Sequence, residues 1–460
     1  MVFSSTVFLF LFLPLTLAAY YLTPRRGRNL TLLIASLVFY AWGEPRHVGL
    51  MLLAIALNYA GALLMGAVRS GRGRRAVLFC TLLVDLALLV VFKYAGFFYR
   101  SLARLLGLGG TSPLASIALP IGISFYLFQS MSYCIDVYRG TVEPQRNLIR
   151  FGTYVALFPQ LIAGPIVRYR DVAAQLEERR ETPERFAAGV ALFVIGLGKK
   201  LLLANPVGLL WQELSAESGT AAAWVGMAAY TLQIYFDFSG YSDMAVGLGR
   251  MFGFEFLPNF DYPYLARSVT DFWRRWHISL SSWFREYVYI PLGGNRKGLP
   301  RQMLNLLVVW ALTGLWHGAS WNFVLWGLYY ALLLIAEKLF LLRACEKLPL
   351  PLRRAGTLLA VSLGWMLFYF EDAGELFAFL GRLFRPVPTG GRAADLILGY
   401  LPTLLVACAA ATPLAARLWG RLSSRRPAFW CLCALLAALF LLCVAALAQQ
   451  GYNPFIYFRF

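Results

Sequence analysis

His317 lies in the stretch LTGLWHGASWNFVLWG, residues 312–327, and is one of only three histidines in the chain. Most of its neighbours are apolar or small, and Ser320 and Asn322 lie among them. Glycine and polar residues between two apolar runs predict a helix break, where the backbone needs protein or water to satisfy its polar groups. A histidine in such a partly desolvated cavity could act as a general base toward a hydroxyl, because its reference pKa is about 6.5. This chemistry fits acyl transfer, although a hydrogen-bonded packing histidine would show the same pattern.

A second histidine, His277, lies in DFWRRWHISLSSWFREYVYIPLGGNRKG, residues 271–298. Aromatic residues alternate there with arginines, a pattern typical of a helix at the boundary between lipid headgroups and the apolar core. One interpretation is an interfacial anchor in which His277 is a bystander. The functional interpretation is a basic wall for a phosphorylated ligand, since cations suit phosphate, with candidate contacts at Arg274, Arg275, Arg296 and Lys297.

Two acids interrupt the apolar stretch QIYFDFSGYSDMAVGLG, residues 233–249. They are Asp237 and Asp243, and Ser239 and Tyr241 lie between them. An ionisable group at membrane depth is costly unless it faces a cavity or a partner, so it is a functional candidate. These acids could orient a histidine, receive a proton or cap a broken helix, and the sequence leaves these alternatives open.

Other kinds of catalytic site find no support in the sequence. The three histidines and scattered acids lack metal-ligand spacing, so we expect no metal and no permanently bound cofactor. The sequence contains no nucleophile-elbow, zinc-protease, P-loop or dinucleotide-binding motif in the structural context that such a motif requires. The seven cysteines lie mostly in apolar runs without CxxC spacing and are interpreted as small core residues.

The composition predicts a polytopic membrane protein that positions these residues. Hydrophobic residues make up 59% of the 460 residues and charged residues only 14%, well below the usual charged fraction of about 25% in soluble domains. Apolar runs predict an all-α protein of roughly 11–13 membrane segments, some of them broken or re-entrant. We expect one membrane domain over residues 1–460, with N-terminal spans in 1–110, a catalytic core at about 113–342 and C-terminal spans in 355–460.

Basic residues are distributed as in proteins that follow the positive-inside rule. The chain has 42 Lys and Arg against 23 Asp and Glu, a net charge of +19. The loop at residues 69–75 carries four arginines and the loop at 44–47 carries one, which predicts an outside N-terminus and cytoplasmic loops at 23–28 and 69–75. We therefore interpret the excess positive charge as setting the orientation of the protein in the membrane and contacting lipid headgroups. No motif indicates nucleic-acid binding.

The three quoted segments resemble the signature segments of the membrane-bound O-acyltransferase family. The stretches LPIGISFYLFQSMSYCIDVYRG, LIAGPIVRYRD and the terminal FIYFRF are similar to its bacterial branch that acetylates alginate. The resemblance implies helices arranged in a ring or funnel around a central tunnel, in the inner membrane. It also implies acetyl-CoA as the cytoplasmic co-substrate, His317 as the principal catalytic residue and His277 as the second functional histidine, which we expect to orient the thioester or polarise its carbonyl.

The same resemblance implies a separate extracytoplasmic partner with a serine-hydrolase-like fold, which passes the acetyl group to a polysaccharide. The acceptor could equally be another glycan, such as cellulose or peptidoglycan. A polysaccharide or lipid transporter would also contain kinked helices and buried acids, but transporters commonly show matching broken segments in two halves, and we detect none. A structural scaffold would tolerate substitution of both histidines.

Overall fold

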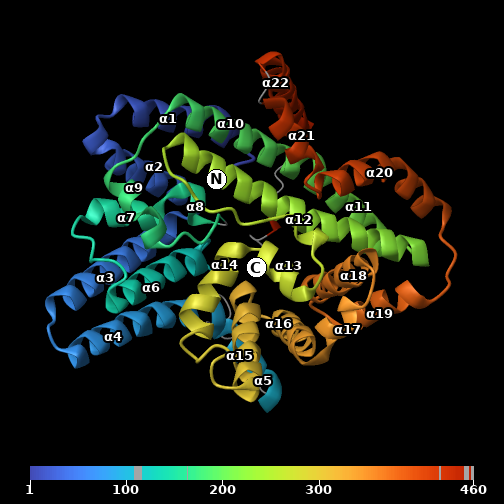
Figure 1. Cartoon of the computed structure of the whole chain (residues 1–460), viewed down its shortest axis with the longest axis horizontal. Helices are drawn as coiled ribbons and strands as arrows, with labels where there is room; N and C mark the ends of the chain where they lie inside the picture. The colour runs from blue at the N-terminus through green and yellow to red at the C-terminus, as the bar shows by residue number, and fades with distance from the viewer. Residues whose placement is uncertain (108–116, 163, 424–425, 450–454, 457–460) are drawn as a thin grey trace. The chain divides into compact units, whose positions relative to one another are not determined.

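The computed structural model describes residues 1–107, 117–162, 164–423, 426–449 and 455–456. Within these residues the secondary structure is helical throughout, which confirms the expected all-α class (Figure 1). Residues 113–116, at the start of the expected catalytic core, lie outside the described part. The chain forms two compact units: unit 1 comprises Met1–Leu192 and Ala245–Leu257, and unit 2 comprises Phe193–Met244 and Pro258–Phe460.

Unit 1 contains nine helices of its own within the described residues. Helix α2 packs against α7, and α3 packs against both α4 and α6. A buried hydrogen bond of 2.9 Å from the Asn58 side-chain amide to Asp85 joins α3 to α4. The helices are α1 (Leu13–Leu22), α2 (Arg28–Gly43), α3 (Val48–Ala67), α4 (Gly71–Leu89), α5 (Ala95–Leu106), α6 (Ile123–Arg139), α7 (Leu148–Ala156), α8 (Phe158–Leu161) and α9 (Tyr169–Glu177).

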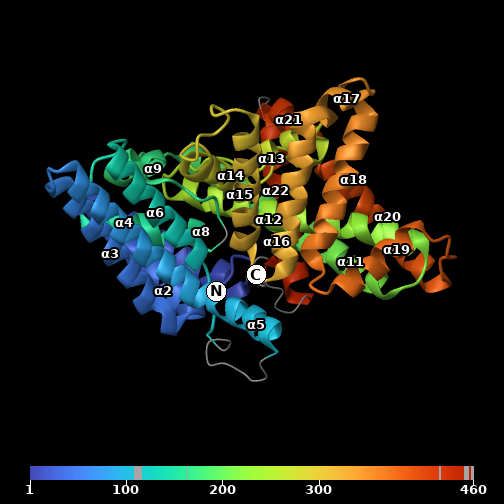
Figure 2. The ribbon, with the colours of Figure 1, turned by 90° about the horizontal axis from the view of Figure 1, so that it is seen from below.

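Unit 2 is built around a hairpin of α15 and α16, and α16 also packs against α18 (Figure 2). Helices α10 (Pro183–Gly198) and α12 (Thr220–Met251) contribute residues to both units. The other helices of unit 2 are α11 (Asn205–Ala216), α13 (Val269–Arg275), α14 (Ile278–Phe284), α15 (Leu299–His317), α16 (Trp321–Ala336), α17 (Leu342–Glu346), α18 (Leu350–Tyr369), α19 (Ala373–Phe384), α20 (Gly391–Ala410), α21 (Leu414–Ser423) and α22 (Arg426–Gln449).

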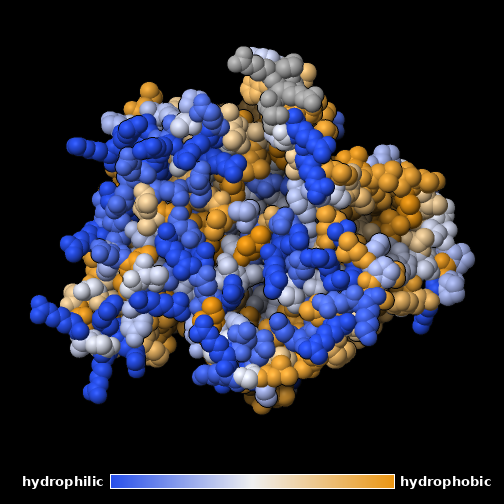
Figure 3. All heavy atoms as spheres, in the orientation of Figure 1, coloured by the Kyte–Doolittle hydropathy of each residue, from blue (hydrophilic) through white to orange (hydrophobic). Residues whose placement is uncertain are grey.

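Six helical stretches in the described residues are long and apolar enough to cross a membrane. The other expected membrane segments correspond to helices that are shorter or carry more polar residues. Apolar side chains cover the outside of α20, as the hydrophobic surface over this helix in Figure 3 shows, and Leu398 and Leu405 are 66% and 62% exposed. Such a surface needs lipid around it. The six stretches are Pro45–Ala67, Gly71–Leu106, Pro183–Ala216, Trp321–Glu346, Gly391–Ala410 and Phe429–Gln449.

Candidate active site

The helix break expected around His317 is present in unit 2. Helix α15 ends at His317, and α16 begins at Trp321. The two helices approach closely at Gly314, where an added Cβ atom would lie 2.2 Å from the backbone oxygen of Phe323. Since no side chain fits there, the small residues of this motif set the helix contact that holds His317 in place.

Aromatic rings surround the imidazole of His317, which is only 4% exposed. The ring centroids of Trp326 and Phe368 lie 5.0 and 5.4 Å from that of His317, both in edge-on contacts. Trp326 belongs to α16 and Phe368 to α18, so neighbours from two other helices fix the orientation of the imidazole. A wall of rings also limits access of water, which strengthens electrostatic interactions at this position.

His277 has an unusual backbone conformation at the start of α14. Its φ angle is +46°, in the left-handed region that residues other than glycine seldom adopt. The residue is buried, and its Nδ1 atom lies 3.3 Å from Oδ1 of Asn259. Backbone strain of this kind costs about 1–3 kcal/mol and is concentrated at functional sites. The conformation therefore strengthens the functional interpretation of His277 over the bystander interpretation.

Asn259 fixes the proton position on His277. The same Oδ1 atom accepts hydrogen bonds from the backbone nitrogen of Ser279 at 3.1 Å and from its hydroxyl at 2.9 Å. A backbone N–H can only donate, so the atom of Asn259 at this position must be the oxygen. The contact with Nδ1 then favours a proton on Nδ1 and a lone pair on Nε2. Burial lowers the pKa of His277 to about 3, so the ring is neutral at physiological pH.

The structure brings the two histidines together. Their ring centroids are 6.5 Å apart, and Trp316 lies beside both of them. A cavity of about 250 Å³ reaches His277 between α13, α14, α15 and α16. Its walls include the apolar side chains of Leu280 and Trp310. His277 therefore lines this cavity, whereas His317 is not among its lining residues and lies 6.5 Å from His277, measured between ring centroids.

Three cations line this cavity: Arg274, Arg285 and Lys338. Of the four cations expected to contact phosphate, only Arg274 is among them. Arg275 instead pairs with Asp271 at 2.9 Å and with Asp261 at 3.3 Å, which neutralises its charge. Arg296 and Lys297 are exposed in the loop before α15, outside the residues that line the cavity.

Sequence reasoning missed Arg285 and Lys338 as members of the cavity wall. The signal for Arg285 was present, because it belongs to the same aromatic and basic stretch as Arg274. Lys338 lies 53 residues further along the chain, within a stretch long and apolar enough to cross a membrane. Only the fold reveals that it reaches the same cavity.

The two acids of α12 form ion pairs with consecutive lysines. Asp237 lies 2.5 Å from Nζ of Lys200, and Asp243 lies 2.6 Å from Nζ of Lys199. The helix runs without a break from Thr220 to Met251, so neither acid caps a broken helix. The lysine pair was missed, although two adjacent cations within an apolar run were visible in the sequence.

Asp237 also holds the end of the described chain. Its Oδ2 atom accepts a 2.7 Å hydrogen bond from the backbone nitrogen of Ile456, and Tyr241 stacks on Phe455 with ring centroids 4.9 Å apart. Ser239, between the two acids in sequence, is buried. Residues 457–460, the remainder of the terminal FIYFRF, lie outside the described residues.

Asn322 and Ser320 occupy the start of α16. The side-chain amide of Asn322 donates a 3.2 Å hydrogen bond to the backbone oxygen of Phe368, and Ser320 precedes the helix without a side-chain capping bond. Asn322 therefore contacts the backbone of Phe368, whose ring lies against His317. In the part of the chain that the structure describes, no three His, Cys, Asp or Glu side chains are grouped so as to hold a metal ion.

Comparison with known proteins places this site in context. The sequence model of MBOAT, the membrane-bound O-acyltransferase family, matches residues 143–370, a range that contains both histidines. A probable alginate O-acetylase AlgI from Pseudomonas putida is 42% identical, and the alignment covers 100% of both chains. The protein of the same name from Pseudomonas aeruginosa is 45% identical over 87% of this chain and 80% of its own length. A peptidoglycan O-acetyltransferase from Helicobacter pylori is 33% identical over 74% of this chain and 71% of its own.

Proposed function

Because the chain belongs to the membrane-bound O-acyltransferase family, we propose that it moves acetyl groups from cytoplasmic acetyl-CoA across the membrane to an alginate-type exopolysaccharide. Acyl transfer is the chemistry of the family. The choice of alginate rests on relatives named alginate O-acetylase, which are more similar than the peptidoglycan O-acetyltransferase. The observation that carries the proposal is the 6.5 Å approach of His277 and His317 beside a cavity with cations at its wall.

The cavity suits the acyl end of acetyl-CoA. Leu280 and Trp310 offer apolar walls to the thioester arm, while Arg274 and Arg285 are exposed and available to phosphate oxygens. Guanidinium groups match phosphate geometry, so the charged part of the donor can remain at the mouth while the thioester enters. The co-substrate then places its carbonyl near His277 without any permanently bound cofactor.

A proton must move for the acetyl group to transfer. The acceptor hydroxyl attacks the thioester carbonyl, the new C–O bond forms, and the C–S bond breaks. We assign His317 as the general base that takes the hydroxyl proton and returns it to the departing thiolate. His277, with its lone pair on Nε2, suits a hydrogen bond to a hydroxyl or thiol. This tautomer favours an orienting role over polarisation of the carbonyl, which requires an N–H donor.

Polar residues around the two histidines hold their rings and neighbours in position. Asn259 fixes the tautomer of His277, and Asn322 fixes Phe368 against His317. The pair of Lys200 and Asp237 holds α12, whose Phe238 packs on His277 with ring centroids 4.7 Å apart. We therefore regard Asp237 and Asn322 as positioning residues.

We further propose an inner-membrane location and delivery of the acetyl group to an extracytoplasmic partner of serine-hydrolase-like fold. The direct test is incubation of the purified protein with radiolabelled acetyl-CoA, with and without the proteins encoded beside it. Alginate, cellulose and peptidoglycan fragments are supplied in separate reactions. We expect label on alginate only when a partner is present. Label movement without covalent transfer would support a transporter and contradict this proposal.

Orientation gives a separate prediction. The arginine distribution in the first loops predicts an outside N-terminus and a cytoplasmic loop at residues 69–75. In a variant without native cysteines, Arg72→Cys should resist a membrane-impermeant thiol reagent in intact cells and react after the membrane is opened. If Arg72→Cys is labelled in intact cells, the loop is outside the cytoplasm and the orientation is the opposite of the one predicted.

Donor binding gives a prediction that separates adjacent arginines. Arg274→Gln should raise the KM for acetyl-CoA about tenfold, because hydrogen bonds to a charged group contribute about 1.5–3 kcal/mol. The kcat should change less, as expected when binding is lost equally from the ground state and the transition state. Steady-state kinetics at matched protein amounts measure both constants.

Arg275→Gln is the matched control, since Arg275 is engaged by Asp261 and Asp271. Its KM should remain within about twofold of wild type, because Arg275 does not line the cavity and its partly exposed ion pairs contribute little. The Arg296→Gln, Lys297→Gln variant should behave in the same way. Equal KM values for the Arg274 and Arg275 variants would remove Arg274 from the donor site.

A further inference from the structure

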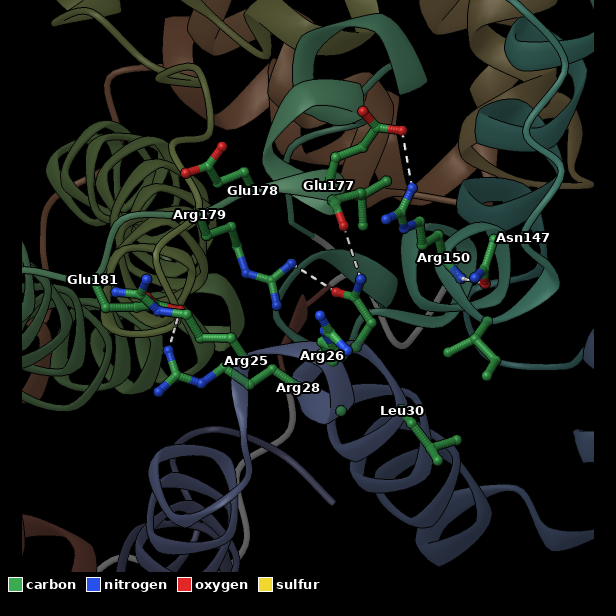
Figure 4. Close-up of a pocket in the computed structure, with 14 residues that line it drawn as sticks. Arg25, Arg26, Arg28, Leu30, Asn147, Arg150, Glu177, Glu178, Arg179 and Glu181 are labelled. Atoms are coloured by element: carbon green, nitrogen blue, oxygen red, sulfur yellow. Dashed lines mark hydrogen bonds and ion pairs between the residues drawn. The ribbon is translucent and has the colours of Figure 1, made fainter.

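A second, strongly basic cavity lies in unit 1, distant in sequence from the two histidines. It has a volume of about 400 Å³ and is formed by three segments: the loop before α2, the start of α7 and the end of α9 (Figure 4). Five arginines and three glutamates line it, which leaves a formal excess of two positive charges. The arginines are Arg25, Arg26, Arg28, Arg150 and Arg179.

Three of these arginines are held in place by other side chains. Arg28 pairs with Glu181 at 2.8 Å, and Arg150 pairs with Glu177 at 2.9 Å. Arg179 donates a 2.7 Å hydrogen bond to Asn29 and lies over the ring of Phe254, 4.4 Å from its centroid. These contacts, several of them marked in Figure 4, make a fixed wall and neutralise two of the three glutamates.

The other two arginines are available for a ligand. Arg25 and Arg26 are exposed, and within the described residues neither makes an ion pair or hydrogen bond through its side chain. Glu178 is the remaining acid of the cavity. Two exposed guanidinium groups beside Arg179 outweigh this one carboxylate, so the cavity attracts an anion, and phosphate oxygens match the guanidinium fork.

An apolar stripe starts at the rim of the cavity. Leu30 lines the cavity, and Ile34, Val38 and Trp42 follow it at four-residue spacing along α2. All four side chains are 44–61% exposed. Residues four apart lie on the same side of a helix, so the stripe continues from the cavity along one side of α2. An anionic head with an apolar tail fits this arrangement better than a free anion.

We propose that this cavity binds the phosphate of an anionic phospholipid, with an acyl chain along the stripe of Leu30, Ile34, Val38 and Trp42. The arginines of the loop face the headgroup, and the stripe faces the hydrocarbon. Basic pockets between helices at the membrane surface recognise anionic headgroups in this way. The site is independent of the acyl-transfer chemistry, since none of its residues belongs to the unit that holds the two histidines.

Native mass spectrometry of the purified full chain, titrated with phosphatidylglycerol, tests the proposal. We expect saturable binding of one lipid, and Arg25→Gln, Arg26→Gln together should weaken it about 30-fold, because each surface cation contributes about 1 kcal/mol to anionic-lipid binding. Within the described residues these two exposed side chains make no ion pair or hydrogen bond, so the variant should remain folded. Arg69→Gln, Arg72→Gln is the control, since it removes the same charge from two exposed residues at the start of α4, outside the cavity.

Two further titrations separate the possible ligands. Phosphatidylcholine should bind at least about tenfold more weakly than phosphatidylglycerol, and inorganic phosphate should not compete at equal concentration. Equal binding of phosphatidylcholine would show that charge does not select the lipid and would overturn the proposal. Competition by inorganic phosphate at equal concentration would assign the cavity to a free anion and likewise overturn it. If the control variant loses phosphatidylglycerol affinity to the same extent, binding depends on net charge alone and the cavity is not a specific site.

Discussion

We expect His317→Ala to remove nearly all acetyl transfer while the protein stays folded and inserted. A positioned general base contributes about 10² to 10⁴ in rate, and no other described side chain occupies the break between α15 and α16 with the chemistry to replace it. The smaller alanine leaves a gap among Trp326 and Phe368, but the helix contact at Gly314 is untouched. Acetyl transfer by membranes of matched protein abundance is the measurement.

The third histidine of the chain provides a matched control. His47 lies in unit 1, at the start of α3, and contacts Glu44 at 2.6 Å. His47→Ala should therefore transfer acetyl groups at close to the wild-type rate. A His317→Ala protein that keeps more than about a tenth of wild-type turnover would fall outside the usual effect of losing a general base, and His317 would then be a packing residue.

Substitutions of two neighbouring residues should reduce acetyl transfer to different extents. His277→Ala should also be severely impaired, because His277 is the histidine that lines the cavity. Asn322→Ala should lose less activity, since Asn322 reaches His317 only through Phe368. Equal losses in the Asn322 and His317 variants would mean that packing, and not proton transfer, is what both substitutions disturb.

The helix break at His317 was predictable because its determinants are local. Glycine, serine and asparagine between two apolar runs indicate a break without knowledge of any distant partner. The all-helical class follows in the same way from the length and apolar character of the runs. The surroundings of Arg274 and Arg275 could be separated only in part, because Arg275 pairs with the nearby Asp271 and also with Asp261, which lies 14 residues before it.

The two ion pairs between lysines and acids of α12 could not be predicted from the sequence, because their partners are also distant along the chain. Lys199 and Lys200 lie 44 and 37 residues from the acids they contact. No periodicity in the segment Lys199–Ala204 that follows α10, or in α12, indicates which acid pairs with which lysine. The left-handed φ of His277 was also hidden, because glycine is the residue normally used to indicate such a position. In both cases the fold imposes what the local sequence does not specify.

The ion pair of Lys200 and Asp237 gives the largest expected effect on stability. Their side chains are 5% and 2% exposed, so Asp237→Ala removes the carboxylate closest to a buried ammonium group. Breaking a buried pair from one side costs about 3–5 kcal/mol of the free energy of unfolding. The substitution also removes the acceptor of the Ile456 hydrogen bond. We therefore expect a much lower unfolding midpoint of the purified protein in detergent.

The adjacent pair is the natural control for this prediction. Lys199 and Asp243 are 22% and 27% exposed, so their ion pair is less buried than that of Lys200 and Asp237, and Asp243→Ala should lower the unfolding midpoint less than Asp237→Ala does. Replacing both partners of the buried pair, as Lys200→Met with Asp237→Leu, should recover most of the stability, because no charge then stays buried. Acetyl transfer by this double variant shows whether α12 needs the ion pair itself or only a filled, neutral contact behind Phe238. Equal destabilisation by Asp237→Ala and Asp243→Ala would contradict the role assigned here to burial.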